Sequence, residues 1–172
     1  MGAPGVSGGS VRAYVGLGAN LDDPAAHVRR AFEDLGRIAA TRCVSRSRLY
    51  RNPPMGPADQ PDYVNAAAAL DTRLPPPELL AALQAIERAH GRTRDGVRWG
   101  PRTLDLDLLL YGDLESDDPR LTLPHPGLHR RAFVLYPLLE IAPGLAIPGR
   151  GPLAALAAAV PGTGLQALAE SP

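Results

Sequence analysis

Two strand–helix–strand patterns, followed by a segment of short helices, predict an α+β or α/β sandwich for this chain of 172 residues. The length suits one compact domain, and a hydrophobic share of 45% is enough for a buried core. No repeat of solenoid length is visible. We expect one domain at residues 11–160, with a disordered leader at 1–10 and a C-terminal tail at 161–172.

The first unit lies in residues 12–49. Residues 12–18 are typical of a short strand that ends in a glycine turn. A helix is expected from Pro24 to about residue 40, because Asp23 suits the N-cap and apolar residues follow at the 3.6-residue period. Residues 42–49 alternate as a strand does, and we expect the arginines on one side of that strand to face solvent.

The second unit follows a loop at 51–61, which contains four prolines. Residues 62–72 predict a strand, and residues 75–90 predict a helix with Gly91 as its stop. A second loop, rich in arginine and glycine, is expected at 91–101, and the clearest strand at 103–111. From Arg130 on, short helical segments alternate with prolines and glycines.

The charge composition limits how the chain can bind phosphate. Its 18 cationic residues are all arginines and balance 18 acidic ones, so the net charge is zero. This balance argues against a non-specific polyanion binder. Without lysine, neither a Schiff base nor a Walker-type phosphate lysine is possible. Phosphate would have to be bound by arginines, backbone amides or a metal.

Cysteine content and hydropathy indicate a cytoplasmic protein. Cys43 is the single cysteine, which excludes an internal disulfide and a cysteine-cluster zinc site. The first ten residues lack the features of a secretory signal. The uncharged stretch at 151–169 is interrupted by prolines and glycines, so we expect a short helix there and no membrane span.

Asp105 and Asp107 are the most informative pair of residues. They lie two apart in the predicted strand at 103–111, so both carboxylates point to one face while Leu104, Leu106 and Leu108 point to the other. Two adjacent carboxylates repel each other unless a cation lies between them, and Mg²⁺ prefers carboxylate, phosphate and water oxygens. The alternative is an ordinary solvated strand face, although aspartate is depleted in strands.

The arginine-rich loop lies directly before this pair. Arg92, Arg94, Arg98 and Arg102 suit phosphate binding, because guanidinium groups bind phosphate oxygens in pairs. A solvated charged loop is the alternative. Trp99 lies in the same loop, where stacking on a ligand and packing against the protein remain equally open.

Three further features are weaker. Tyr63 and Asn65 share a strand face that could offer a flat ring an aromatic surface and an amide edge, although Tyr63 also suits ordinary strand packing. Residues 16–20 begin like a dinucleotide-binding fingerprint but lack its third glycine, so we expect a tight turn. His125 lies between two prolines, where we expect an exposed side chain, with a metal ligand as the alternative.

Five blocks of sequence resemble the 6-hydroxymethyl-7,8-dihydropterin pyrophosphokinase family, also named 2-amino-4-hydroxy-6-hydroxymethyldihydropteridine diphosphokinases. They are GLGANL at 16–21, LYRNPPMGPADQPDYVNAA at 49–67, IERAHGRTR at 86–94, RWGPRTLDLDLLLYG at 98–112 and LPHPGLHRRAFVLYPLLEIAP at 123–143. The fourth block is highly specific on its own, and the resemblance covers about residues 11–160.

This resemblance implies a fold, a reaction and a set of site residues. The fold is α+β, a three-layer α/β/α sandwich with a ferredoxin-like core and a mainly antiparallel sheet. The reaction transfers the β,γ-diphosphate of ATP to the pterin hydroxymethyl group and releases AMP, in folate biosynthesis. Two Mg²⁺ ions would bind Asp105 and Asp107, which together with Arg92 and Arg102 are the implied catalytic residues. The implied pterin-binding positions are Asn52, Pro53, Met55, Tyr63, Asn65, Trp99 and Phe133. The implied ATP-binding positions are Gln84, Glu87, Arg92, Arg94, Arg102, Leu108, Arg120, Thr122, His125 and Arg131.

The implied mechanism is in-line attack of the hydroxymethyl oxygen on the β-phosphorus, without a covalent enzyme intermediate. We expect the loops at 51–61 and 91–101 to close and exclude water. We also expect a monomer whose partners are ATP and the reduced pterin, with no nucleic acid and no membrane.

Two other functions are compatible with parts of the sequence. A Mg²⁺-dependent nucleotidyltransferase or phosphohydrolase would use the same acidic pair, and only the products would distinguish it. An RNA-binding ferredoxin-like module would use the arginines of 42–51, but the eight aromatic residues and zero net charge argue against it.

Overall fold

The computed structural model describes residues 9–53, 61–91 and 103–168. The strands of its main sheet are β1 (Val11–Ala19), β2 (Thr41–Arg46), β3 (Tyr50–Asn52), β4 (Tyr63–Thr72), β5 (Asp105–Tyr111) and β10 (Gln166–Ala167). Two hairpins consist of β6 (Ser116–Asp118) with β7 (Leu121–Leu123), and of β8 (Ala146–Ile147) with β9 (Gly151–Pro152). The helices are α1 (Pro24–Gly36), α2 (Pro76–Ala89), α3 (Ala132–Ile141) and α4 (Leu153–Ala158), with a 3₁₀ turn, η2, at Leu128–Arg130.

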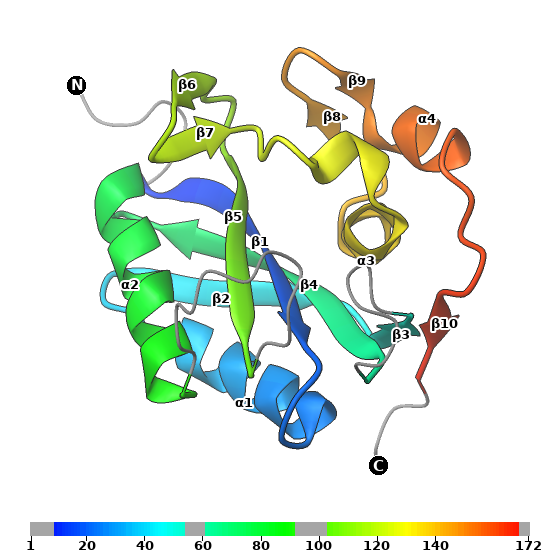
Figure 1. Ribbon diagram of the computed structural model, residues 1–172. Helices are drawn as coiled ribbons and strands as arrows, with labels where there is room; N and C mark the ends of the chain where they lie inside the picture. Colours follow the sequence, from blue (N-terminus) through cyan, green and yellow to red (C-terminus); the bar gives the residue numbers. More distant parts are fainter. Residues whose placement is uncertain (1–8, 54–60, 92–102, 169–172) are drawn as a thin grey trace.

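The fold is α+β, with helices on both faces of a six-stranded sheet (Figure 1). The strand order is β10-β3-β4-β1-β5, and β2 pairs with the second half of β4. All of these pairings are antiparallel. Helices α1 and α2 pack on one face of the sheet, and α3 and α4 on the other. The three-layer, mainly antiparallel architecture expected from the sequence is therefore confirmed.

Strand β1 forms the middle of the sheet between β4 and β5. Ala13, Val15 and Leu17 pack in the core under α1 and α2, whereas Tyr14 packs in the core under α3 and α4. A strand covered on both faces reads as a nearly continuous apolar run, as residues 13–19 do.

Helix α1 begins as the sequence predicts and ends four residues earlier than the expected residue 40. Its N-cap is Asp23, whose side chain accepts a hydrogen bond from the Ala26 amide at 3.4 Å. At the other end Ala40 has φ 54°, a left-handed conformation that turns the chain into β2. Ile38 is still buried, so the apolar period continues past the last helical residue.

The strand expected at 42–49 is shorter than predicted, and a strand lies where the proline-rich loop was expected to begin. Strand β2 ends at Arg46, and β3 covers Tyr50–Asn52. Both strands pair with β4, one with each half. Ser47 connects them, because its amide donates to the Ala67 carbonyl and its hydroxyl accepts from the Ala67 amide, each at 2.9 Å. Partners on β4, distant in sequence, therefore outweigh the local proline signal.

The C-terminal segment returns to the sheet. Gln166 and Ala167 form β10, which pairs with β3, and the Leu168 amide donates to the Leu49 carbonyl at 2.8 Å. The segment expected as a tail thus contains a strand of the main sheet. Among the described residues, no helix is long and apolar enough to cross a membrane.

Candidate active site

Strand β5 presents Asp105 and Asp107 on the sheet face that α3 covers. The alternating leucines before, between and after them, Leu104, Leu106 and Leu108, are buried in the opposite core, under α1 and α2. The predicted division of this strand into an acidic and an apolar face is therefore confirmed. Both aspartates are partly exposed, as groups that meet a ligand from solvent must be.

Gly16 and Gly18 lie directly beside the two aspartates, on β1. Gly18 pairs with Asp105 and Gly16 with Asp107, so the four residues point to the same face. The expected tight turn at this place is wrong, because β1 continues to Ala19 and pairs on both sides. A Cβ atom at Gly18 would lie 2.8 Å from the Asn65 side-chain oxygen. The glycine therefore leaves room for the amide of Asn65.

Strands β3 and β4 supply an amide pair and an aromatic ring. Asn65 on β4 pairs with Gly18 on one side and Tyr50 on the other, and Tyr63 pairs with Asn52. The Asn65 side-chain amide donates to the Asn52 side-chain oxygen, and the Asn52 amide donates to the Pro53 carbonyl at 3.0 Å. Both asparagines are buried, so these bonds hold their amides in place.

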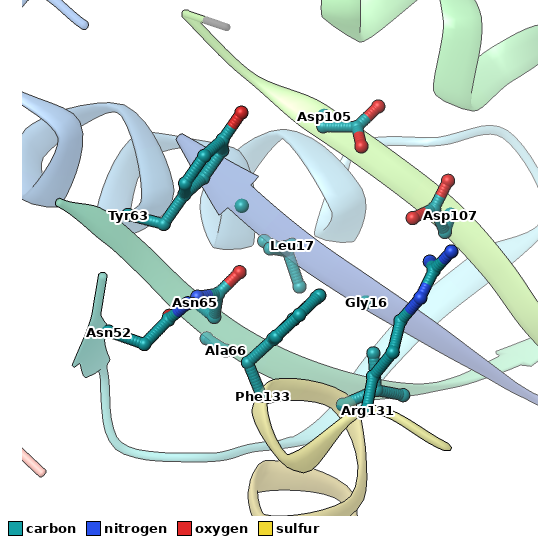
Figure 2. Close-up of a pocket in the computed structure, with 12 residues that line it drawn as sticks. Gly16, Leu17, Asn52, Tyr63, Asn65, Ala66, Asp105, Asp107, Arg131 and Phe133 are labelled. Atoms are coloured by element: carbon teal, nitrogen blue, oxygen red, sulfur yellow. The ribbon is translucent and has the colours of Figure 1, made fainter. Parts of the chain in front are cut away.

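The N-terminal end of α3 supplies Arg131 and Phe133. Arg131 is the N-cap residue, and its guanidinium lies against Gly127, where a Cβ atom would be 2.4 Å from Cζ. In Figure 2 the Arg131 side chain points towards Asp107, and Asn65 lies between the rings of Tyr63 and Phe133. Because Gly127 has no side chain, the Arg131 guanidinium can lie against the Gly127 backbone while its side chain extends towards Asp107 on β5.

His125 adds a neutral imidazole at the acidic end. Its Nδ1 accepts a hydrogen bond from the Gly127 amide at 3.1 Å, and its Nε2 lies 3.8 Å from Oδ1 of Asp107. Burial, and then the Arg131 guanidinium, lower the pKa of His125 to about 4, against a raising effect of Asp105. The ring is thus neutral at pH 7 with its proton on Nε2. The expected exposed position is wrong, because only 21% of this side chain is accessible.

The aspartates, the asparagines, Tyr63, Arg131 and Phe133 line one pocket, and His125 lies beside it at Asp107 (Figure 2). Strands β1, β3 and β4 form its floor and one wall, β5 forms the acidic wall, and the start of α3 forms the third side. The lining residues are Gly16, Leu17, Gly18, Asn52, Tyr63, Asn65, Ala66, Asp105, Asp107, Arg131, Phe133 and Val134. Seven residues expected from the sequence therefore meet here, namely Asn52, Tyr63, Asn65, Asp105, Asp107, Arg131 and Phe133.

Other expected site residues lie elsewhere in the described part of the chain. The Leu108 side chain is in the core, on the sheet face opposite the pocket. Gln84 and Glu87 belong to α2, which covers that same opposite face, and Glu87 is buried. Arg120 is exposed in the β6–β7 hairpin and pairs with Asp118, while Thr122 lies on β7. Pro53 follows Asn52 at the end of β3. Met55, Arg92, Arg94, Trp99 and Arg102 lie outside the described residues.

Glycines are the functional positions that the sequence reasoning missed. Gly18 and Gly127 each make space for a polar side chain of the pocket. A signal for the first was present, because Gly16 and Gly18 repeat at the same two-residue period as Asp105 and Asp107. Gly127 carries no such local signal, since the Arg131 guanidinium that it accommodates is positioned by the tertiary structure.

The donor set at the acidic wall fits magnesium. No group of three or more histidine, cysteine, aspartate or glutamate side chains among the described residues could hold a metal ion by itself. Two carboxylates are nevertheless sufficient for an ion that keeps several waters and takes its other ligands from phosphate groups. Arg131 nearby adds a cation that can pair with phosphate oxygens.

The chain is similar to one family of enzymes over most of its length. The profile of 7,8-dihydro-6-hydroxymethylpterin-pyrophosphokinase (HPPK) matches residues 14–143. A 2-amino-4-hydroxy-6-hydroxymethyldihydropteridine pyrophosphokinase of Pseudomonas aeruginosa is 52% identical over 157 residues, which cover 91% of this chain and 96% of that protein. The protein of the same name from Haemophilus influenzae is 47% identical over 138 residues, 80% of this chain and 86% of that protein.

Solved structures support the fold. The crystal structure of wild-type HPPK-DHPS from Plasmodium falciparum matches with a TM-score of 0.66 and 12% sequence identity. The match covers 87% of this chain and 44% of that longer chain, so this chain spans less than half of it. At this level of identity the likeness shows a shared fold and nothing further.

Proposed function

The chain belongs to the 7,8-dihydro-6-hydroxymethylpterin-pyrophosphokinase family, and we propose that it carries out that reaction with magnesium held by Asp105 and Asp107. It is a pyrophosphokinase of folate biosynthesis, which transfers the β,γ-diphosphate of ATP to the hydroxymethyl group of 6-hydroxymethyl-7,8-dihydropterin and releases AMP.

One observation carries the assignment of the site. The aspartate pair on β5 and the Tyr63–Asn65–Phe133 group share one pocket, and in the sheet only Gly18 of β1 separates Asp105 from Asn65. A flat polar ring and a phosphate chain with its cation would therefore lie side by side. This is the arrangement that transfer between a pterin and a nucleotide needs.

Asn65, Tyr63, Phe133 and Asn52 bind the pterin in this proposal. The two rings offer aromatic surfaces for the flat ring system, and the asparagine amides offer donors and acceptors for its polar edge. The hydrogen bond between the two asparagines orients both amides before the ligand arrives. Binding to preformed partners costs less side-chain entropy than binding to mobile ones.

Asp105 and Asp107 hold the metal in this proposal, with His125 and Arg131 beside them. Bound magnesium would supply charge to the triphosphate oxygens and favour deprotonation of the attacking hydroxyl. Arg131 pairs with phosphate oxygens, and the neutral His125 donates from Nε2 without adding a second cation. We assign the remaining phosphate contacts to Arg92 and Arg102, in line with the family resemblance.

The bonds of the reaction balance without a covalent enzyme intermediate. The hydroxymethyl oxygen releases its proton to solvent and forms a bond to the β-phosphorus. The bond from that phosphorus to the bridging oxygen of the α-phosphate breaks, and AMP leaves with that oxygen. The chain contributes by placing the two substrates in line and neutralising the charge on the transferred group.

We also propose a cytoplasmic monomer whose partners are ATP and the reduced pterin. The absence of a spanning helix among the described residues agrees with this location. The balanced formal charge gives no support to a nucleic-acid partner.

The test is to incubate the purified chain with ATP, Mg²⁺ and the reduced pterin and to identify both products by mass spectrometry. We expect AMP and the pterin diphosphate in equal amounts, and no turnover when EDTA replaces Mg²⁺. Release of ADP, or of diphosphate not attached to the pterin, would instead indicate a phosphohydrolase or a nucleotidyltransferase.

A further inference from the structure

A cluster of ionisable side chains connects α1 to the last turn of α2, outside the pocket. It consists of His27, Arg30 and Asp34 on α1 and of His90, the residue that caps α2. His27 is 8% exposed, and the side chain of His90 is 6% exposed. Apolar side chains would fill this space between α1 and α2 without the cost of burying polar groups. Two buried imidazoles in contact with a carboxylate and a guanidinium therefore indicate a role beyond packing.

The distances between these side chains indicate which nitrogen atoms donate hydrogen bonds and which accept them. The Nδ1 atoms of His27 and His90 are 2.8 Å apart, so one of them donates and the other accepts. Arg30 lies 3.0 Å from Nδ1 of His27, and a guanidinium can only donate, so His27 is the acceptor. Nε2 of His90 lies 2.8 Å from the Asp34 carboxylate, which accepts when ionised.

Nδ1 of His27 therefore carries no proton, and Nε2 of His90 donates to the Asp34 carboxylate. The pKa of His27 agrees, because burial lowers it first, Arg30 and His90 lower it further, and Asp22 and Asp23 raise it. The guanidinium at His27 also leaves no place for a metal ion at that nitrogen.

The last turn of α2 is also tied to the acidic strand. The Glu87 carboxylate accepts a hydrogen bond at 2.8 Å from the amide of Leu106, which lies between Asp105 and Asp107. Glu87 and His90 are three residues apart on the same helix, so one turn contacts both β5 and α1. Directly after His90, Gly91 has φ 85°, which turns the chain away from the helix just before Arg92.

We propose that His90 is a positioning residue for diphosphate transfer, held between Asp34 and His27, and that it fixes the last turn of α2 against α1. This inference rests on the proposed function. It goes beyond it by assigning a role to a cluster that touches neither substrate.

The first test is nitrogen NMR of the imidazoles in the full chain at pH 7, without substrates. We expect a proton on Nε2 of His90, donated to Asp34, and the proton of His27 on its Nε2. A His90 ring without a proton on Nε2 would overturn the proposal. This measurement needs no activity, so it separates failure of this inference from failure of the proposed reaction.

The second test measures kcat and both KM values across pH for His90→Ala, His90→Gln and the wild-type chain. We expect kcat of His90→Ala to fall about tenfold with both KM values within about twofold, because displaced groups slow chemistry more than binding. The kcat of His90→Gln should lie between those of His90→Ala and the wild type, because its amide replaces only the bond to Asp34.

His90→Gln is the second variant in case His90→Ala does not fold, because its amide can still donate to Asp34. The matched control is Arg37→Ala, which removes the other Asp34 partner, at 3.3 Å, and should leave the kcat profile unchanged. If either variant folded and kept wild-type kcat at pH 7, His90 would be only a packing residue and the proposal would be wrong.

Discussion

At the scale of single residues, the pocket depends on which side chains are present and on which are missing. Asp105 and Asp107 provide charge, and Gly18 and Gly127 provide the space in which other polar groups lie. The first kind of residue can be recognised from its own chemistry. The role of the second kind becomes clear only from the neighbour that would collide with a side chain, although the spacing of Gly16 and Gly18 already hinted at it in the sequence.

Removing either aspartate should abolish turnover without unfolding the chain. We expect Asp105→Asn and Asp107→Asn to lower Mg²⁺-dependent kcat by about 10³-fold or more, as loss of a key phosphate-neutralising group does elsewhere. The melting temperature should stay unchanged or rise, because two like charges no longer repel each other. Asp117→Asn, an exposed aspartate of β6, is the control and should keep full activity. Wild-type activity of either site variant would contradict the metal assignment.

Adding one methyl group to β1 should affect pterin binding selectively. In Gly18→Ala the new Cβ would lie 2.8 Å from the Asn65 side-chain oxygen, so the amide must move from its bonded position. We expect KM for the pterin to rise about tenfold, with KM for ATP nearly unchanged, because the displaced amide costs about 1–2 kcal/mol of binding. Gly36→Ala is the control, since nothing lies within 4 Å of the added atom. Equal effects on both KM values would argue against this role of Asn65.

At the scale of elements, α3 and β3 must be held together because each carries part of the pocket. The Glu140 carboxylate, near the end of α3, accepts from the Tyr50 hydroxyl and from the Arg48 amide at 3.0 Å. Arg48 also donates its Nε to Glu140 at 3.3 Å. Burial raises the pKa of Glu140, but the bonds from Tyr50 and Arg48 outweigh it, so the net shift is downward.

Glu140→Gln should destabilise the chain in a pH-dependent way. A carboxylate whose folded pKa is lowered stabilises the protein above its unfolded pKa, and that stabilisation is lost as pH falls through the folded value. We expect a loss of about 1–2 kcal/mol in unfolding free energy at pH 7 and a difference that vanishes at acid pH. Denaturant melts across pH would measure it. Glu33→Gln, in an exposed pair with Arg46, should change stability little. A pH-independent difference would contradict this account.

At the scale of the whole molecule, the sheet joins segments from both ends of the chain around one pocket. β10, from the C-terminal segment, pairs with β3, which carries Asn52, and β1, from the N-terminal segment, separates β4 from β5. The pterin wall and the acidic wall are therefore neighbours only because the complete sheet has formed.

Truncation after Thr163 should weaken pterin binding. It removes β10, the bond from Leu168 to Leu49, and Gly164, which lies against Pro53. We expect a severalfold rise in KM for the pterin, with KM for ATP unchanged, because β3 loses its outer partner. The control is truncation after Leu168, which keeps all of these contacts. Identical kinetics of the two truncated chains would show that β10 has no role in the site.

The sequence by itself determined the α+β class, the central strands and helices, and the two faces of β5. These features follow from the spacing of apolar residues and from the alternation of residue types along each segment. Both depend only on the local sequence and not on how distant segments pack. It also carried the family resemblance, through blocks such as RWGPRTLDLDLLLYG.

Only the tertiary structure decided how those parts meet. It placed β3 where prolines predicted a loop, continued β1 through two glycines, and partly buried His125 beside Asp107. It also brought His27 and His90 into contact, although they are 63 residues apart. In each case the deciding partner lies far away in the sequence, and its hydrogen bonds or its volume outweigh the preference of the local segment.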